Sequence, residues 1–194
     1  MVIFISMNGF NHKKAVQALA ILASKEGGTI NKMKAIKLIW LSDRLHLRKF
    51  GRTITGDTYF AMKLGPVASN IKDIIEASTY CSEEELTYSA DFLNRIDSNN
   101  YGTQNPPLLK VFSKSDIEAI DNVYAVYGHL NQFELSELSH LFPEWKKWES
   151  ALEKNQSRYP MDFEDFFQDT NTDNPLFKED QETLDLVKSL YTRK

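Results

Sequence analysis

The stretch "IKLIWLSDRLHLRKFGRTITGDTYFAMKLGPVASNIKDII", Ile36 to Ile75, changes character halfway along. Its first half has the apolar spacing of an α-helix, and at about 100° per residue its side chains divide into two apolar arcs. The first arc contains an acid; its members are Met33, Ile36, Ile39, Trp40, Asp43, Leu47 and Phe50. The second arc is Leu38, Leu41 and Leu45. A helix with two apolar arcs is expected to be covered by neighbours on most sides.

Asp43 is the residue of the first arc that needs a physical explanation. Burying an unpaired carboxylate costs several kcal/mol, so the acid must be matched or kept neutral. We predict that Asp43 is buried and that it accepts hydrogen bonds from His46, from Arg52 or from backbone amides of the following turn. A structural tie between helix and turn is the preferred reading. A catalytic Asp–His pair stays open as the alternative, although no positioned nucleophile accompanies it.

The rest of the stretch predicts a short β segment between two helices. "TITGDTYFAMKLGPVAS" breaks the helical period with β-favouring residues and two turn pairs, Gly56-Asp57 and Gly65-Pro66. Before it, Asn11 can cap a helix that the glycines at 27–28 stop, and a second helix is expected from about Asn31 to Phe50. After it, Ser69 can cap a third helix that runs through Ala77. The sequence therefore predicts a mainly α fold: a compact helical domain with a short β-hairpin or extended segment between its second and third main helices.

The C-terminal half continues the helical pattern with more loops. Residues 78–110 are polar and irregular, 107–112 reads as a short edge strand, and 158–175 reads as an acidic, aromatic loop. Four helix starts are expected there, at the Ser115-x-x-Glu118 capping box, Asn131, Pro143 and Pro175, the last with a Leu184, Val187 and Tyr191 stripe. We divide the chain into a helical domain at 1–155 and, at 156–194, an acidic loop and helix that pack on the same domain.

Composition sets broad limits on the class of protein. The chain has 194 residues, 42% of them hydrophobic and one a cysteine, Cys81, so a folded core is expected and an internal disulfide is excluded. The opening apolar run "MVIFIS" is too short for a signal peptide or a membrane span. We therefore expect a cytoplasmic protein with no membrane partner.

The net charge of −4 is unevenly distributed along the chain. Residues 32–52 contain seven Lys or Arg against one acid, whereas residues 129–194 contain 8 Lys or Arg against 14 Asp or Glu. This polarity predicts either a macromolecular partner or contact between the two halves. The cations of 32–52 surround their helix instead of forming one stripe, so specific nucleic-acid binding is not expected.

Patterns for catalysis, metal or cofactor binding are missing from the sequence. "GRTITGD" and "KLGPVAS" lack the spacings of phosphate-binding and dinucleotide-binding loops and read as turns. His12, His129 and His140 have no metal-ligand spacing. We therefore predict no catalytic residues, no metal site and no cofactor.

Residues 37–69, "KLIWLSDRLHLRKFGRTITGDTYFAMKLGPVAS", closely resemble the signature of Panacea-domain (SocA-like) proteins. That signature is a helix with a Trp/Tyr-x-x-Asp-x-x-x-Leu core that runs into a Gly-x-x-Ile/Leu-Thr-x-Asp turn and a Tyr-x-Ala-x-x-x-Gly-Pro-Val segment. The matching positions are Trp40, Asp43, Leu47, Gly51, Ile54, Thr55, Asp57, Tyr59, Ala61, Gly65, Pro66 and Val67. A weaker similarity is "LSELSHLFPEW" at 135–145, which contains His140 and Trp145.

The resemblance implies a helical antitoxin that neutralises a cognate protein toxin by direct, stoichiometric contact and is not an enzyme. Two alternatives stay open: an adaptor that delivers its toxin to a AAA+ protease, and a nucleic-acid-binding regulator. The signature residues, with His140 and Trp145, would then be framework residues. For the partner surface we predict the turn at 52–57 with Arg52, Lys63 on the hairpin, and an exposed helix face that carries Arg44 and Arg48.

Overall fold

The computed structural model describes residues 9–154, 158–170 and 175–192, and its fold is mainly α, as predicted. The opening apolar run lies outside these residues. The helices are α1 (His12–Lys25), α2 (Lys32–Phe50), α3 (Ser69–Glu76), α4 (Glu83–Ala90), α5 (Lys114–Tyr127), α6 (Gln132–Ser139), α7 (Pro143–Lys146), α8 (Glu149–Lys154) and α9 (Gln181–Thr192). The strands are β1 (Thr29–Asn31), β2 (Tyr59–Met62), β3 (Gly65–Ala68), β4 (Leu93–Arg95), β5 (Asn100–Thr103) and β6 (Tyr159–Pro160). Short 3₁₀ turns are η1 (Leu109–Val111), η2 (Phe163–Phe167) and η3 (Pro175–Phe177).

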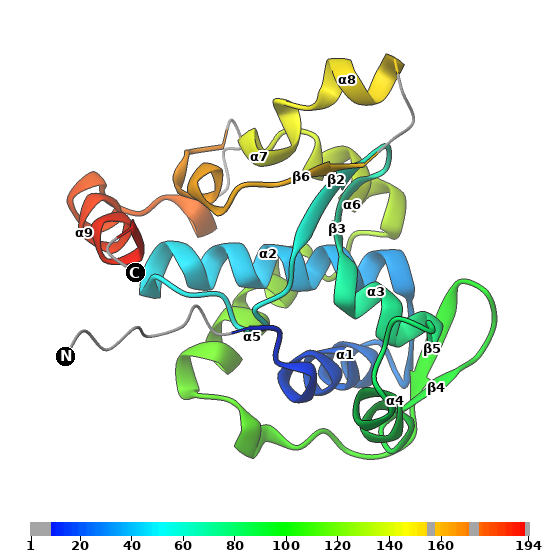
Figure 1. Ribbon diagram of the computed structural model, residues 1–194. Coiled ribbons are helices and arrows are strands. Elements are labelled where there is room, and N and C mark those ends of the chain that lie inside the picture. Colours follow the sequence, from blue (N-terminus) through cyan, green and yellow to red (C-terminus); the bar gives the residue numbers. More distant parts are fainter. Residues whose placement is uncertain (1–8, 155–157, 171–174, 193–194) are drawn as a thin grey trace.

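Helix α2 is the centre of the molecule. Every residue from Lys34 to Arg48 is buried, so both apolar arcs and the gap between them are covered except at the ends of the helix, where Met33 is partly buried and Phe50 is exposed. Asn31 caps its start through bonds to the amides of Met33 and Lys34, and Gly51 ends it with a left-handed φ of 69°. Figure 1 shows why so much is covered: α1 and α5 lie below α2, the β2–β3 hairpin, α6 and α7 lie above it, and α9 lies at its C-terminal end.

The predicted hairpin is present between α2 and α3. Strands β2 and β3 pair antiparallel, with Tyr59 opposite Ala68 and Met62 opposite Gly65, and β6 adds a third strand beside β2. The hairpin alternates as the period of a strand requires: Tyr59 and Ala61 are buried, and Phe60 and Met62 are only partly buried. A second antiparallel sheet has the order β1-β5-β4.

Several element boundaries differ from those predicted. The capping box before α5 is formed by Ser113 and Asp116, two residues earlier than expected, and α3 has no bond from the Ser69 side chain to its amides. Residues 78–110 contain α4, β4 and β5 instead of an irregular loop, and the predicted edge strand is the η1 turn. The helix expected at Pro143 is divided into α7 and α8, and the helix expected at Pro175 begins at Gln181 after the η3 turn.

The described C-terminal residues pack on the same core as the helical domain. Phe166 and Phe177 are buried, and Leu184 and Val187 of α9 join them in the core, as the predicted stripe requires. Within the described ranges, no helix is both long and apolar enough to cross a membrane. Cytoplasmic location stays a prediction.

Candidate functional site: the signature hairpin and its supports

Asp43 is wholly buried and its carboxylate is saturated by donors from the turn and the hairpin. Oδ1 accepts from the amides of Ile54 at 2.7 Å and Thr55 at 3.1 Å. Oδ2 accepts from Thr55 Oγ1 at 2.5 Å and from the Tyr59 hydroxyl at 2.7 Å. Burial raises the pKa of Asp43 to about 6, although these four bonds work against the rise. The predicted tie between helix and turn is therefore confirmed.

Asp57 is a second buried acid of the signature, and it caps α3 from a distance. Its Oδ1 accepts from the amide of Asn70 at 3.0 Å and its Oδ2 from the amide of Ile71 at 2.8 Å. These are amides of the first turn of α3, to which the residue at the N-cap position, Ala68, offers no side-chain acceptor. Burial raises the pKa of Asp57, while the amide bonds favour its charged form. Asp57 thus does the work that was predicted for Ser69.

Of the donors considered for Asp43, the backbone amides of the turn are the ones present, whereas His46 bonds to other groups. Its Nδ1 faces the carbonyl oxygen of Arg52 at 2.8 Å, and its Nε2 faces Ser115 Oγ at 3.0 Å and Asp116 Oδ1 at 3.2 Å. The serine and the carboxylate approach the same nitrogen, whereas a catalytic triad places them on opposite nitrogens. The ring is wholly buried, and burial lowers its pKa. This grouping joins α2 to α5 and was not predicted, because Ser115 and Asp116 lie far from His46 in sequence.

The tip of the hairpin is held by its backbone. The carbonyl oxygen of Leu64 accepts from Lys37 Nζ and from Ser136 Oγ at 2.8 Å, and the carbonyl oxygen of Met62 accepts from Trp145 Nε1 at 2.8 Å. Lys37 is 1% exposed, and burial lowers its pKa to about 7. Three donors from α2, α6 and α7 thus hold the tip through its carbonyl groups, and the side chains of Lys63 and Leu64 make no bond in this anchoring.

Of the remaining framework residues, Gly65 and the pair His140 and Trp145 pack around this tip. Gly65 has a φ of 98°, and a side chain there would meet Ser139 and Lys37. The rings of His140 and Trp145 stack with centroids 3.7 Å apart, and Trp40 packs edge-on against Phe142. Among the other framework residues, Leu47 and Pro66 are buried and Val67 is partly buried.

Arg44 is buried, so the prediction that it lies on an exposed face is wrong. Its Nε donates to Glu144 Oε1 at 2.8 Å and its Nη2 to the carbonyl of Gln168 at 2.6 Å. Its guanidinium lies 4.9 Å from the ring centres of both Phe142 and Phe177. The planar guanidinium of an arginine can be buried when it stacks on aromatic rings and forms hydrogen bonds in this way. The position of Arg44 between two apolar arcs of the helix does not show that such partners are present.

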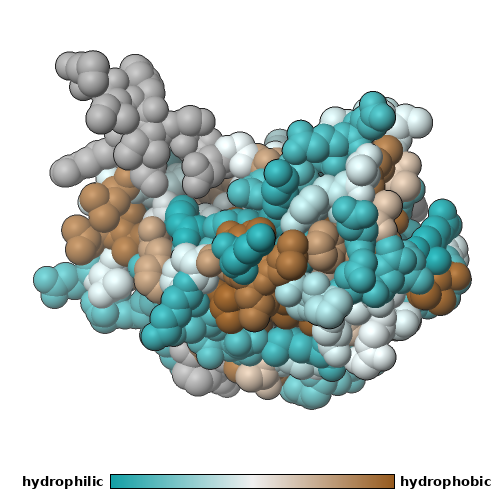
Figure 2. Space-filling view, turned by 90° about the horizontal axis from the view of Figure 1, so that it is seen from below, coloured by the Kyte–Doolittle hydropathy of each residue, from teal (hydrophilic) through white to brown (hydrophobic). Residues whose placement is uncertain are grey.

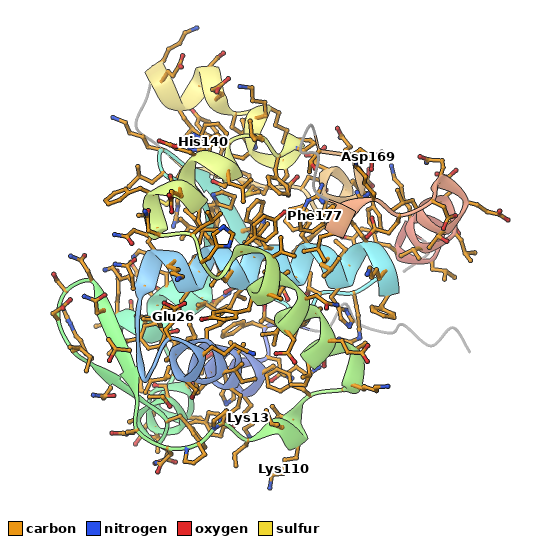
Figure 3. The ribbon with its side chains drawn as sticks, turned by 180° about the vertical axis from the view of Figure 1, so that it is seen from behind. Lys13, Glu26, Lys110, His140, Asp169 and Phe177 are labelled. Atoms are coloured by element: carbon orange, nitrogen blue, oxygen red, sulfur yellow. The ribbon has the colours of Figure 1, made fainter. Side chains whose placement is uncertain are left out.

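Arg48 is also buried, and the same correction applies to it. It donates to Glu179 at 2.7 Å, to Asp169 at 2.8 Å, and to the carbonyls of Phe166, Gln168 and Phe177 at 2.9–3.1 Å. These five bonds tie the C-terminal residues to α2, and Figure 3 labels Asp169 and Phe177 beside that helix. The uneven charge distribution had two explanations, a macromolecular partner or contact between the two halves of the chain. The second is present, because the basic helix pairs with acids of the C-terminal half.

The other two predicted partner residues differ in exposure. Arg52 is half-buried; it forms an ion pair with Asp116 Oδ1 at 2.9 Å and donates a hydrogen bond to Ser113 Oγ at 3.2 Å. Lys63 is exposed at the hairpin tip. Beside it the structure shows a groove that sequence reasoning missed, because its walls come from α2, α3 and the hairpin.

The described residues contain no cluster of three or more His, Cys, Asp or Glu that could hold a metal ion. The buried acids instead bond to amides, hydroxyls and cations of the fold. The arrangement therefore gives a braced hairpin that leaves its tip side chains at the surface.

The sequence was compared with protein families, curated proteins and solved structures. The model of the family described as antitoxin SocA-like, Panacea domain, matches residues 36–146, which include both signature segments and more than half of the 194 residues. No curated protein and no solved structure matches the chain. The chain belongs to the SocA-like antitoxin family and carries its Panacea domain.

Proposed function

We propose that this protein is an antitoxin that neutralises a cognate protein toxin by direct, stoichiometric binding. The observation that carries the proposal is the family match over residues 36–146. Its toxin is the product of a neighbouring gene, since antitoxins of this kind are encoded beside their toxins.

The geometry of the signature supports binding as the mode of action. Asp43, Asp57 and Trp145 each hydrogen-bond to backbone groups of the turn, α3 or the hairpin. A loop that is fixed before binding loses little conformational entropy when a partner docks, which raises affinity without chemistry. The signature residues thus act through the shape they impose on the hairpin.

Calorimetric titration of the purified neighbouring gene product with this protein tests the proposal. We expect a saturable exchange of heat at a fixed molar ratio and co-elution of the two chains on gel filtration. Absence of a complex at micromolar concentrations, with both proteins folded, would contradict direct neutralisation.

Measuring the toxin in cells with and without the protease separates the adaptor alternative. If the protein delivers its toxin to a AAA+ protease, the toxin's half-life in cells will fall when the protein is present and recover when the protease is deleted. If binding alone neutralises, growth will be protected equally with and without the protease.

A further inference from the structure

A groove of about 400 Å³ runs along the outer side of the hairpin tip. Its apolar floor includes Met33 and Ile36 from α2 and Met62, Leu64 and Val67 from the hairpin. Leu64, at the tip of the braced turn, is 52% exposed. Methionine and leucine side chains adapt their shape to an inserted apolar group, so this floor is suited to receive one.

The side chains of Lys63 and Leu64 at the tip do not anchor the hairpin to the rest of the fold. The tip is anchored through the carbonyl oxygens of Met62 and Leu64, to which Trp145, Lys37 and Ser136 donate. The exposed side chains of Lys63 and Leu64 are therefore free to contact something outside the chain.

The rim of the groove has an excess of positive charge. Lys32 and Lys72 share a single acid, Glu76, at 2.8 and 2.5 Å. Lys63 adds a further exposed cation, and Lys37 lies beneath the floor. The residues that line this groove thus include one acid, Glu76, against the exposed or part-exposed ammonium groups of Lys32, Lys63 and Lys72, and this excess of positive charge complements a partner surface with carboxylates.

A second hollow of about 460 Å³ continues this surface over the hairpin. It shares Met62, Val67 and Lys72 with the first, so the two hollows are neighbours. Its wall carries Tyr80, which is 89% exposed, and Arg158, which lies 4.7 Å from the ring centre of Phe60. Exposed Tyr and Arg are the residue types that most often dominate binding energy at protein interfaces.

We infer that this double hollow is the docking surface for the toxin, and that it receives a segment whose apolar side chain inserts beside Leu64 while flanking carboxylates meet the lysine rim. The inference rests on the proposed function and adds to it the face used and the chemistry of the partner. A nucleic acid suits the surface less well, because the Glu76 carboxylate in the rim repels phosphates and the floor is apolar.

A matched pair of double variants tests the inference. Lys63→Glu with Leu64→Ser alters the tip; Lys110→Glu with Leu109→Ser makes the same changes at η1, where Leu109 is 55% exposed. Figure 3 labels Lys110 at the opposite end of the molecule from His140, whose ring stacks on Trp145 beneath the hairpin. Figure 2 shows a cluster of hydrophobic side chains on the lower face of the molecule, so the tip is compared with other exposed apolar side chains of the surface. Leu108, next to Leu109, is also exposed, so the control alters a second exposed apolar site.

Binding of the purified neighbouring gene product is measured for wild type and both variants by calorimetry, after thermal unfolding has shown equal stability. We expect the tip variant to raise the dissociation constant at least about tenfold. The η1 variant should keep the dissociation constant within about twofold of the wild-type value. The association rate of wild type should fall with added salt, and that of the tip variant should fall less, because Lys63 attracts the partner's acids.

Each outcome separates the inference from the function beneath it. If the wild-type protein does not bind, both the proposed function and the inferred docking surface are wrong. If wild type binds but the tip variant binds equally well, or only the η1 variant loses affinity, the function stands and the groove is the wrong face. Loss of binding to a labelled DNA duplex in the tip variant, with toxin binding unchanged, would assign the groove to nucleic acid and overturn the inference.

Discussion

The Asp43 carboxylate accepts hydrogen bonds from two backbone amides and two hydroxyls, all of them buried. Asp43→Ala would leave those donors without a partner and open a cavity in the centre of the fold. We expect a loss of at least about 3 kcal/mol in the free energy of unfolding, measured by chemical denaturation.

Asp43→Asn is the matched control for that variant. Its carbonyl oxygen can accept from the amides of Ile54 and Thr55, and the hydroxyls of Thr55 and Tyr59 can rotate to accept from its NH₂ group. We expect it to retain most of the stability that Asp43→Ala loses. Equal losses in the two variants would show that the charge, and not the bonding pattern, is what stabilises the turn.

Lys37 predicts a dependence of stability on pH. Its pKa is lowered by burial from 10.5 to about 7, so between these values the unfolded chain binds more protons than the folded chain. The free energy of unfolding should therefore rise as pH increases from about 7 to about 10, by on the order of 3 kcal/mol from this group. Lys37→Met should show a smaller rise in denaturation series at several pH values. Parallel wild-type and variant profiles would mean that the amine is not desolvated.

The role of Asp43 could be predicted from the sequence because the helical period places it among apolar residues and its donors follow within 16 positions. Arg44 and Arg48 could not be assigned in this way. Their acidic partners Glu144, Asp169 and Glu179 lie 100 to 131 positions away, and periodicity gives no information on such distant pairs. A cation between two apolar arcs therefore looked like a surface residue.

The hairpin depends on the close approach of its turn to α6. Gly65 combines a φ of +98° with a position where a Cβ would overlap Ser139 Oγ and lie 2.5 Å from Lys37 Nζ. Gly27 also has a positive φ, +80°, but has open space around it. We expect Gly65→Ala to reduce the free energy of unfolding by at least about 1 kcal/mol more than Gly27→Ala, since only the first adds a steric clash to the backbone strain. Equal effects on thermal unfolding would refute the close contact.

Arg48 joins α2 to the C-terminal elements, and Arg48→Lys keeps its charge while removing its fork of donors. We expect amide hydrogen exchange to accelerate in residues 163–170 and 175–177, while α1 keeps its protection. Lys49→Ala, an exposed change on the next residue, is the control and should leave exchange unchanged. Unaltered exchange in Arg48→Lys would show that apolar packing alone holds these residues.

Elements with a strong local signal were the ones that sequence could place. Helix α2 has both a cap and a terminal glycine, and the hairpin has turn pairs and alternation, so both were predicted. The first turn of helix α3 is capped by Asp57, which lies 13 positions before Asn70. Strands β1 and β5 pair although about seventy residues separate them in sequence. Such long-range bonds decided the boundaries that sequence reasoning misplaced, and the groove is likewise a product of tertiary packing.

Across the whole molecule, the basic segment is largely neutralised from within. Lys34 pairs with Glu26, Arg44 with Glu144 and Arg48 with Asp169 and Glu179. We therefore expect weak DNA binding that declines with salt, in a mobility-shift assay with the DNA upstream of its own gene. Nanomolar, sequence-selective binding at about 0.15 M salt would favour a regulator instead.

Stoichiometric neutralisation by a braced scaffold is tested most directly by titrating toxin activity. A fixed amount of the purified neighbouring gene product is assayed for its toxic activity while this protein is added in steps, with no protease present. Binding predicts that activity falls linearly and reaches its minimum at a fixed molar ratio of the two chains. Full protection at strongly substoichiometric amounts would contradict it, because one molecule would then be inactivating many.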